Sequence, residues 1–347
     1  MTVVWFRPGQ LGDYEARQLG DGGQGTVYGV PTPPGGLVGD FAYKEYREDV
    51  PCDGDALMAM TGFPSLLYTS DRAFLIPRLA WPVGIAYDGP APTRMPPSAN
   101  PGTRVVGFLM RRTTWAYELD STALGKVKQQ ALEFLLNDDA YLTRIGLSHV
   151  DDVVRMELLT DLAHTISRLH RLGVVVGDLS PKNVLFTVVG YPRILLIDCD
   201  SMRYRGRTVL APVDTPDWEV PEADKATPAS DAWKFGLIAM RLFSRSQTST
   251  DLGPLFRLSP GLADLAARSQ SNEPRRRPAV GEWLPQLRFV LNGWRIPPPP
   301  PYPPPPPPPR SWGERARSSW GGRAASTLLA LLLLGSAALA AARLLPV

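Results

Sequence analysis

Two acidic residues in the middle of the chain, Asp178 and Asp198, have residue types and a spacing that suit phosphate chemistry. They lie twenty positions apart, and each follows a run of apolar and β-branched residues, which predicts that each stands at a strand end. Asn183 follows Asp178 by five positions. Carboxylate and amide oxygens are hard ligands that suit Mg²⁺. Asn183 and Asp198 are therefore candidate metal ligands, and Asp178 is a candidate base that orients an attacking hydroxyl.

A glycine-rich segment near the N-terminus is a candidate phosphate-binding loop. It reads Gly20-Asp21-Gly22-Gly23-Gln24-Gly25-Thr26-Val27. Glycine lets the backbone approach phosphates that any Cβ would block. Lys44 closes the next β-rich run, Phe41-Ala42-Tyr43-Lys44, and its ammonium group can clamp a phosphate. The candidate nucleotide-binding residues are Gly20, Gly22, Gly23, Gly25, Val27 and Lys44.

These segments occur in an order that resembles the eukaryotic-like protein kinases, in a divergent bacterial form. The glycine-rich segment is similar to G-x-G-x-x-G-x-V, and Asp178 with Asn183 to the D-x-x-x-x-N end of the catalytic loop. Asp198 corresponds to the metal-binding Asp of the DFG motif. The later chain resembles the T-P-x-x-x-x-P-E end of an activation segment, the D-x-W-x-x-G helix motif and the arginine that pairs with the P-E glutamate. The residues concerned are Thr215, Glu222, Asp231 and Arg277.

The resemblance implies an α+β, bilobal protein-kinase-like fold over residues 14–291, with an N-lobe over 14–110 and a helical C-lobe over 111–291. It implies a protein kinase, of the Ser/Thr type, that uses ATP and Mg²⁺, with Asp178 and Lys44 as catalytic residues. The T-P segment favours a protein acceptor, whose identity the sequence does not specify. Two alternatives stay open: a pseudokinase that acts as a nucleotide-responsive binding module, and a kinase-fold enzyme that phosphorylates a small molecule.

The chain departs from the kinase pattern around both aspartates. Val176-Gly177 replaces the usual His-Arg, so an activation-loop phosphate would have no arginine partner there. Ser180 stands where protein kinases usually carry a lysine, and Lys182 is close enough to compensate. Asp200 replaces the glycine of DFG, which predicts a stiffer hinge.

A second departure concerns the partner of Lys44. Protein kinases pair this lysine with a glutamate on the regulatory helix. Glu45 and Glu48 follow Lys44 too closely to lie on that helix, while Asp53 and Asp55 have short side chains. The sequence therefore offers no obvious carboxylate for Lys44.

The secondary-structure elements that must position these residues are predicted from hydrophobic periodicity and from the positions of glycine and proline. A glycine-bearing hairpin is expected over 14–30, a short helix over 55–67, and strands over 73–87 and 104–110. Apolar residues at helical spacing predict a helix over 151–172, ended by Gly173. Further helices are expected over 231–291.

The end of the chain has a different composition. Residues 297–309 are all proline except Tyr302, which predicts a polyproline II linker or, less simply, a ligand for an SH3-like partner. A basic juxtamembrane segment, 310–323, precedes nineteen uncharged residues over 324–342. At ~1.5 Å per residue these span roughly 28 Å, which predicts a single-pass, C-terminal transmembrane helix in the cell membrane. The arginines before the span predict a cytoplasmic kinase domain.

Composition narrows the class further. The net charge is +3 over 347 residues, which gives no reason to expect a nucleic-acid partner. Two cysteines, Cys52 and Cys199, are too few for a disulfide framework, and Cys199 lies beside the candidate metal ligand.

Overall fold

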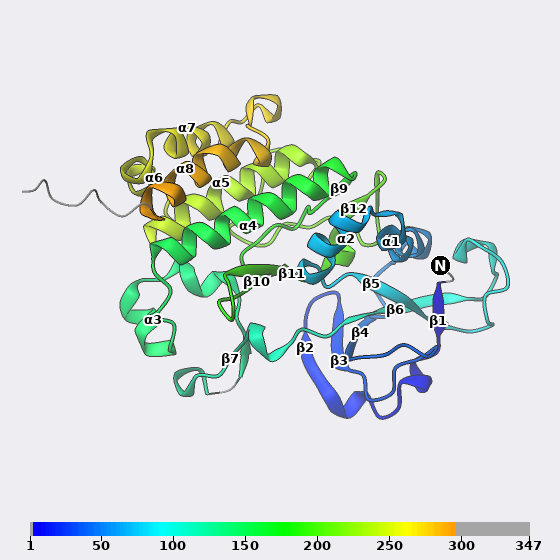
Figure 1. Cartoon of the computed structure of the whole chain (residues 1–347). Helices are drawn as coiled ribbons and strands as arrows, with labels where there is room; N and C mark the ends of the chain where they lie inside the picture. Colours follow the sequence, from blue (N-terminus) through cyan, green and yellow to red (C-terminus); the bar gives the residue numbers. More distant parts are fainter. Residues whose placement is uncertain (1–2, 126, 296–347) are drawn as a thin grey trace, which may run out of the picture. The chain divides into compact units, whose positions relative to one another are not determined.

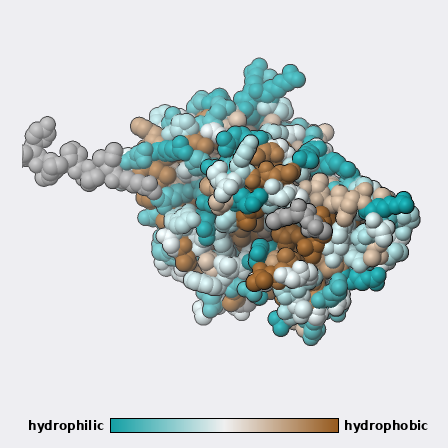
Figure 2. All heavy atoms as spheres, turned by 45° about the vertical axis from the view of Figure 1, so that its right-hand side comes forward, coloured by the Kyte–Doolittle hydropathy of each residue, from teal (hydrophilic) through white to brown (hydrophobic). Residues whose placement is uncertain are grey.

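The computed structural model describes residues 3–125 and 127–295, all of which belong to one compact unit. A sheet-rich part comes first in the chain and a largely helical part follows it (Figure 1). One apolar core continues through both parts, because side chains of the sheet and its helix, such as Phe108 and Met60, belong to the same buried cluster as Leu158 and Leu162 of the helical part. On the face drawn in Figure 2, hydrophilic residues dominate the outer surface and hydrophobic residues gather toward the middle.

A six-stranded sheet forms the first part, in the order β1-β5-β6-β4-β3-β2. The strands are β1 (Val4–Phe6), β2 (Gln18–Asp21), β3 (Gly25–Gly29), β4 (Phe41–Tyr46), β5 (Pro82–Asp88) and β6 (Arg104–Arg111). The expected hairpin over 14–30 is present as β2 and β3, and the expected strand over 104–110 is β6. All neighbours are antiparallel except β1, which pairs in parallel with β5 and extends the sheet to residues before 14.

Two helices follow β4. Helix α1 (Gly54–Leu66) matches the helix expected over 55–67, and the Asp53 carboxylate caps it by accepting from the Ala56 backbone N–H at 2.9 Å. Helix α2 (Thr69–Leu75) occupies part of the segment in which a strand is expected over 73–87. That expectation is wrong before Pro82. Pro77 sits in the first turn of a 3-10 helix over Ile76–Arg78, a position that its fixed φ and its lack of an N–H favour.

The helical part is built around α4 (Asp152–Arg171) and α5 (Pro228–Ser244). Helix α4 lies within the predicted 151–172, is capped by Asp151, and is followed by Gly173 with φ +74°. The helices expected over 231–291 are present as α5, α6 (Gly253–Leu258), α7 (Pro260–Ser269) and α8 (Leu284–Arg295). The short helix α3 (Asp139–Ile145) precedes α4. Helix α5 is buried on nearly every side, so it can anchor the loops that pack on it.

Short strands between α4 and α5 flank the loops that contain Asp178 and Asp198. Strands β10 (Val184–Thr187) and β11 (Arg193–Leu196) form an antiparallel pair. Strands β9 (Val174–Val175), β12 (Arg203–Tyr204) and β13 (Arg207–Thr208) form a second small sheet. The pair β7 (Glu118–Leu119) and β8 (Lys128–Gln129) follows β6 in the chain. The Asp178 loop lies between β9 and β10, and Asp198 follows β11 directly.

The fold class expected from the sequence needs one correction. Its α and β elements are present, but none of the helices formed by residues 3–125 and 127–295 has both the length and the apolar character needed to cross a membrane. The segment 324–342, for which the sequence predicts such a helix, lies outside the described residues, as do the linker 297–309 and the basic segment 310–323.

Candidate active site

A cleft of about 410 Å³ brings together residues that are far apart in the sequence. The β2–β3 hairpin, β4, the end of β6, the Asp178 loop and the turn after β11 all contribute to it. Apolar groups form part of its wall, and Lys44, Asp178 and Asp198 supply charge. Its lining includes Gly20, Gly22, Gly23, Gly25, Val27, Ala42, Lys44, Ala80, Met110, Arg111, Arg112, Asp178, Ile197 and Asp198.

The glycines of the hairpin differ in whether the fold requires a residue without a side chain at their position. Gly25 faces β4 so closely that a Cβ would lie 2.1 Å from the backbone oxygen of Glu45, so packing alone requires glycine there. At Gly20 and Gly23 a Cβ would meet nothing within 4 Å, and these two border the cleft. The tip is held by Arg47, which pairs with Asp21 at 3.0 Å. Gly20 and Gly23 are therefore not required by packing within the hairpin, and both leave its backbone accessible from the cleft.

Lys44 lies on β4, opposite Val27 of β3, and is only 4% exposed. Its Nζ lies 3.0 and 2.9 Å from the two carboxylate oxygens of Asp200 and 3.4 Å from Oδ1 of Asp198. Burial opposes the charge on the ammonium group, but the carboxylates of Asp200 and Asp198 outweigh it and raise the pKa of Lys44. The lysine is therefore a charged group held at the edge of the cleft.

None of the acidic residues considered as partners from the sequence contacts Lys44. Glu45 lies on β4 and accepts hydrogen bonds from Tyr14 and Tyr43 at 3.4 and 3.3 Å. Asp53 caps α1 and pairs with Arg207 of β13, while Asp55 accepts from Ser98. The nearer partner is Asp200, which the sequence marks only as a replacement for glycine, and Asp198 lies farther away at 3.4 Å.

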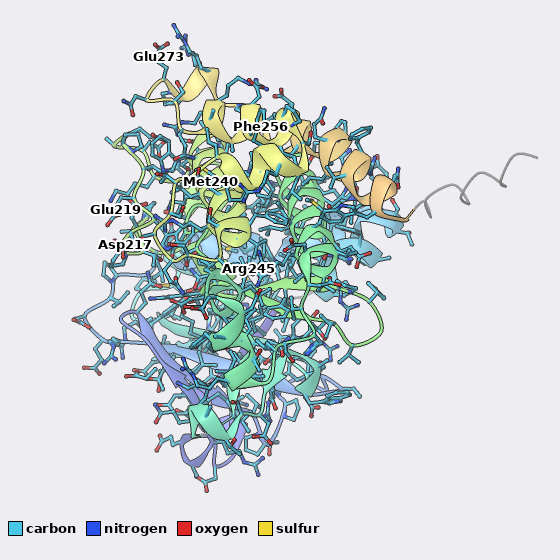
Figure 3. The ribbon with its side chains drawn as sticks, turned by 90° about the vertical axis from the view of Figure 1, so that its left-hand side faces the viewer. Asp217, Glu219, Met240, Arg245, Phe256 and Glu273 are labelled. Carbon is cyan, nitrogen blue, oxygen red and sulfur yellow. The ribbon has the colours of Figure 1, made fainter. Side chains whose placement is uncertain are left out.

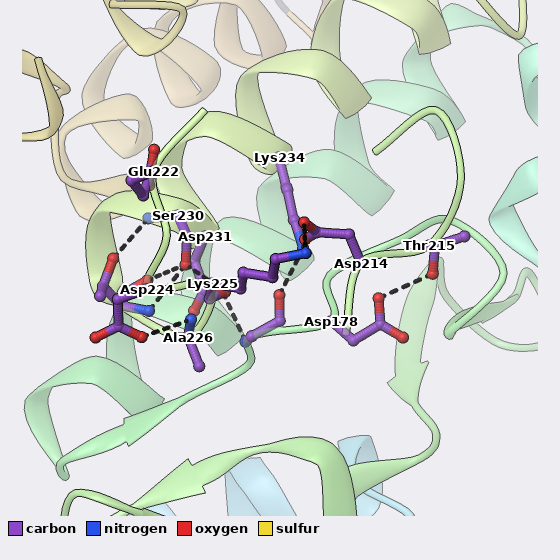
Figure 4. Close-up of polar contacts among 12 residues, drawn as sticks. Asp178, Asp214, Thr215, Glu222, Asp224, Lys225, Ala226, Ser230, Asp231 and Lys234 are labelled. Atoms are coloured by element: carbon purple, nitrogen blue, oxygen red, sulfur yellow. Dashed lines mark hydrogen bonds and ion pairs between the residues drawn. The ribbon is translucent and has the colours of Figure 1, made fainter. Parts of the chain in front are cut away.

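Hydrogen bonds from α5 hold the Asp178 loop in place. Asp231, fully buried, accepts from the backbone N–H groups of Val176 and Gly177 at 2.8 Å each and contacts His170 Nε2 at 2.7 Å. Lys234 of α5 donates to the Gly177 carbonyl at 2.9 Å (Figure 4). Gly177 has φ +73°, a conformation that a side-chain-bearing residue rarely adopts. Backbone geometry thus accounts for the glycine that replaces the usual arginine.

Asp178 itself accepts two side-chain hydrogen bonds. Asn183 Nδ2 donates to Oδ2 at 2.9 Å. The Thr215 hydroxyl donates to Oδ1 at 2.8 Å (Figure 4). Asn183 uses its amide nitrogen in this bond, which leaves its amide oxygen for another partner. The carboxylate is half-buried and borders the cleft, so a hydroxyl placed there can donate to it.

Asp198 stands in a left-handed turn, with φ +52°, directly after β11. Its side chain is 41% exposed toward the cleft. The backbone N–H of Ile197 donates to the Asn183 carbonyl at 3.0 Å, which brings the two candidate metal ligands onto adjacent segments. Among the residues that the structure describes, no group of three or more His, Cys, Asp or Glu side chains could hold a metal ion. An Asp and an Asn suit Mg²⁺ when phosphate oxygens complete its shell.

The lysine expected to compensate for Ser180 is not in the cleft. Lys182 is exposed and lies 3.7 Å from Glu133. Ser180 is fully buried, and its hydroxyl has no hydrogen-bond partner among the described residues. The expected compensation by Lys182 is therefore wrong in this structure. Arg111 and Arg112 at the end of β6 line the cleft instead, and the sequence analysis did not single them out.

The segment between Asp198 and α5 is tied down by ion pairs. Asp214 lies 2.8 Å from Lys234 and 2.9 Å from Lys225. Further along, Arg277 makes a two-pronged ion pair with Glu222 at 2.6 and 2.7 Å, which is the pair predicted from the sequence. The Arg277 side chain is fully buried and its guanidinium also lies over the ring of Trp233. Lys234 occupies a variable position of the D-x-W-x-x-G motif and Asp214 belongs to no motif, so only the structure reveals their pairing.

Other cavities lie outside the cleft. One of about 1020 Å³ lies around the start of α1 and the loop after β5, and neither Asp178 nor Asp198 lines it. Another, about 620 Å³, adjoins the Thr215 segment and has Trp233, Leu237 and Met240 in its wall. Figure 3 shows Asp217 and Glu219 near each other on this side of the molecule, beside the helix that carries Met240. This cavity has no lining residue in common with the cleft, and Asp217 follows Thr215, the hydrogen-bond partner of Asp178, by two positions.

No protein-family model matches this chain, and no curated protein sequence does either. A function must therefore be inferred from the site itself.

Proposed function

We propose that this protein is an ATP-dependent phosphotransferase that transfers the γ-phosphate to a hydroxyl group of a protein, as its resemblance to the protein kinases implies. The proposal rests on the observation that charged residues from distant parts of the sequence meet in one cleft. Lys44, Asp178 and Asp198 come from distant segments yet line one cleft together with the glycine-rich hairpin. The cleft volume of about 410 Å³ is in the range of small-molecule sites.

Each group has a task that its surroundings support. The cleft has an apolar surface suited to a planar base, which is formed by Val27, Ala42, Ala80, Met110 and Ile197. Lys44 supplies a fixed positive charge for phosphate oxygens. Asn183 and Asp198 would hold Mg²⁺, which supplies charge neutralisation of the phosphates. Positioning and charge stabilisation make up most of the catalysis that phosphoryl transfer requires of a protein.

Asp178 is the proposed base. The Thr215 hydroxyl donates a hydrogen bond of 2.8 Å to Oδ1 of Asp178. The carboxylate is therefore oriented to accept from a hydroxyl group. An acceptor hydroxyl in the same relation to Asp178 would be oriented toward the γ-phosphate. The Thr215 segment favours a protein acceptor over a small molecule, because it contacts Asp178 and its continuation, Asp217 and Glu219, lines a cavity.

A second candidate function is a nucleotide-responsive binding module without transfer. The specific observation in its favour is the burial of Ser180 together with the pairing of Lys182 with Glu133. The position at which protein kinases carry a second lysine then has no cation. Phosphate transfer and phosphate binding must therefore be measured separately.

The test compares Asp198→Ala with Asp178→Ala in the full chain. Asp198→Ala should abolish Mg²⁺-dependent ATP binding in a titration. Asp178→Ala should leave binding intact and lower γ-phosphate transfer to a generic protein acceptor by roughly 10²-fold or more. Asp264→Ala, which breaks an exposed ion pair with Arg268, is the control and should change neither. Equal loss of ATP binding in both site variants would contradict the roles, and ATP binding without transfer by the wild type would favour the binding module.

A further inference from the structure

The Lys44 ion pair is formed within the sheet and the turn after β11, without helix α1. The helix has a single carboxylate, Asp55, in its first turn, and this group accepts from the hydroxyl of Ser98 at 2.7 Å. Both carboxylate oxygens of Asp200 instead receive Lys44 Nζ. Lys44 therefore depends on the segment that also carries Asp198.

The surroundings of Asp200 leave it little choice of partner. The residue is 0% exposed and sits in the 3-10 turn Cys199–Ser201 that follows Asp198. A carboxylate excluded from water must find a cation or hydrogen-bond donors. Lys44 provides the cation and two contacts of hydrogen-bond length.

Asp198 and Asp200 thus have separate roles although only Cys199 lies between them. The left-handed backbone of Asp198 directs its carboxylate to the cleft, where it is 41% exposed. Asp200 points into the interior and is fully buried. One short turn therefore carries a carboxylate that is open to ligands and another that is committed to the lysine.

We propose that Asp200 is a positioning residue that holds the Lys44 ammonium group where a nucleotide phosphate can reach it. This inference rests on the proposed function, because it assigns Lys44 to phosphate. A carboxylate from the turn after β11 then takes the role that a glutamate on the helix has in protein kinases. The positions of the phosphate-binding lysine and of Asp198 are then coupled, and a shift of α1 leaves the Lys44 ion pair intact.

A metal-ligand role for Asp200 is the competing assignment. Both of its oxygens already receive Lys44, and burial separates them from the cleft that Asp198 lines. The two roles differ in what a substitution changes. Loss of an anchor weakens binding of the nucleotide phosphates, whereas loss of a ligand raises the Mg²⁺ concentration needed for half-saturation.

The experiment uses the full chain with Asp200→Asn, Asp200→Glu and Lys44→Met, and measures binding of Mg·ATP and of adenosine. Asp200→Asn should weaken ATP at least tenfold and leave both adenosine affinity and Mg²⁺ half-saturation unchanged. Asp200→Glu should recover part of the ATP affinity, since it keeps the charge. The double variant Lys44→Met/Asp200→Asn should bind ATP no more weakly than Lys44→Met, because the two residues act as one unit. Asp71→Asn, which removes a partly buried carboxylate paired with Arg168, is the matched control and should keep wild-type affinity.

Several results would overturn the anchor. Unchanged ATP affinity in Asp200→Asn, or additive losses in the double variant, would do so while the proposed function stands. A raised Mg²⁺ requirement, as in Asp198→Asn, would make Asp200 a metal ligand. If Asp200→Asn does not fold, the Asp200→Glu arm decides, and complete loss of ATP binding in a folded Asp200→Glu protein would also contradict the proposal. Absence of ATP binding in the wild type would overturn both inferences.

Discussion

The Thr215 hydroxyl donates a hydrogen bond of 2.8 Å to Oδ1 of Asp178, across 37 positions of the chain. This contact joins the proposed base to the segment that ends at Glu222. A hydrogen bond to a charged acceptor contributes about 1.5–3 kcal/mol. It can therefore fix the carboxylate in the orientation that an acceptor hydroxyl meets.

The first prediction concerns Thr215→Val, which removes the hydroxyl and keeps the side-chain shape. Phosphate transfer should fall by roughly tenfold or more, in line with the energy of one such hydrogen bond. ATP affinity should not change, because Thr215 does not line the cleft. Steady-state kinetics and an ATP titration check both statements. Thr215→Ser retains the hydroxyl and serves as the control, and faster transfer by Thr215→Val would mean that Thr215 only competes with the acceptor.

The second prediction is a pH dependence that arises from Asp214. Burial alone would raise the pKa of this carboxyl, but the ammonium groups of Lys234 and Lys225 outweigh it and lower the pKa below its ordinary value of 3.8. A lowered pKa in the folded state adds stability that is fully present above the unfolded pKa and is lost as pH falls through the folded pKa. Asp214→Asn should thus be less stable than the wild type at neutral pH, and the difference should shrink below about pH 4.

Denaturant unfolding of both proteins at several pH values measures that difference. Asp224→Asn is a suitable comparison, since it removes a more exposed carboxylate that pairs with Arg203 at 2.9 Å. Surface pairs contribute about 0–1 kcal/mol, so this variant should lose little stability. A constant gap between wild type and Asp214→Asn down to pH 2 would contradict the assignment.

How far the sequence leads depends on whether a residue acts through its neighbours in the chain or across the fold. Helices α1 and α4 and the β2–β3 hairpin follow from local periodicity, caps and glycines, so their positions are predicted closely. Glu222 and Arg277 pair as predicted because both belong to a recognisable motif. The Lys44–Asp200 and Lys234–Asp214 pairs cannot be read from the sequence, since each partner is selected by packing between distant segments.

The strand expected over 73–87 fails for a related reason. Its apolar residues from Phe74 to Leu79 suit a strand or a buried helix equally, and short apolar runs do not distinguish the two. Contacts made in the folded chain decide, because Leu75 is fully buried in α2 and Arg78 pairs with Asp161 of α4 at 2.9 Å. The error does not affect the cleft, since β5 still pairs with β6, whose Met110 lines it.

The third prediction is that Arg277→Ala destabilises the protein without weakening ATP binding. Its side chain is fully buried, and removal leaves the Glu222 carboxylate without its cation. Breaking a buried ion pair in this way typically costs about 3–5 kcal/mol. Chemical denaturation measures the loss. Arg276→Ala is the neighbouring control, because Arg276 is 72% exposed and its ion pair with Glu273 lies at the surface. Thermally neutral Arg277→Ala and Glu222→Ala variants would show that the pair has no stabilising role.

The last prediction separates two uses of glycine in the β2–β3 hairpin. Gly25→Ala should lower the free energy of unfolding, because its Cβ would overlap the backbone oxygen of Glu45 at 2.1 Å and the strands would have to separate. Gly23→Ala should leave stability within about 0.5 kcal/mol of the wild type, because the new methyl group meets nothing within 4 Å. It should nevertheless weaken ATP, since the methyl group keeps the hairpin backbone away from the phosphates. Denaturation curves and ATP titrations of both variants provide the comparison. If Gly23→Ala bound ATP as the wild type does, the hairpin would not cover the phosphates at Gly23, and only Gly25 would have a structural reason to be glycine.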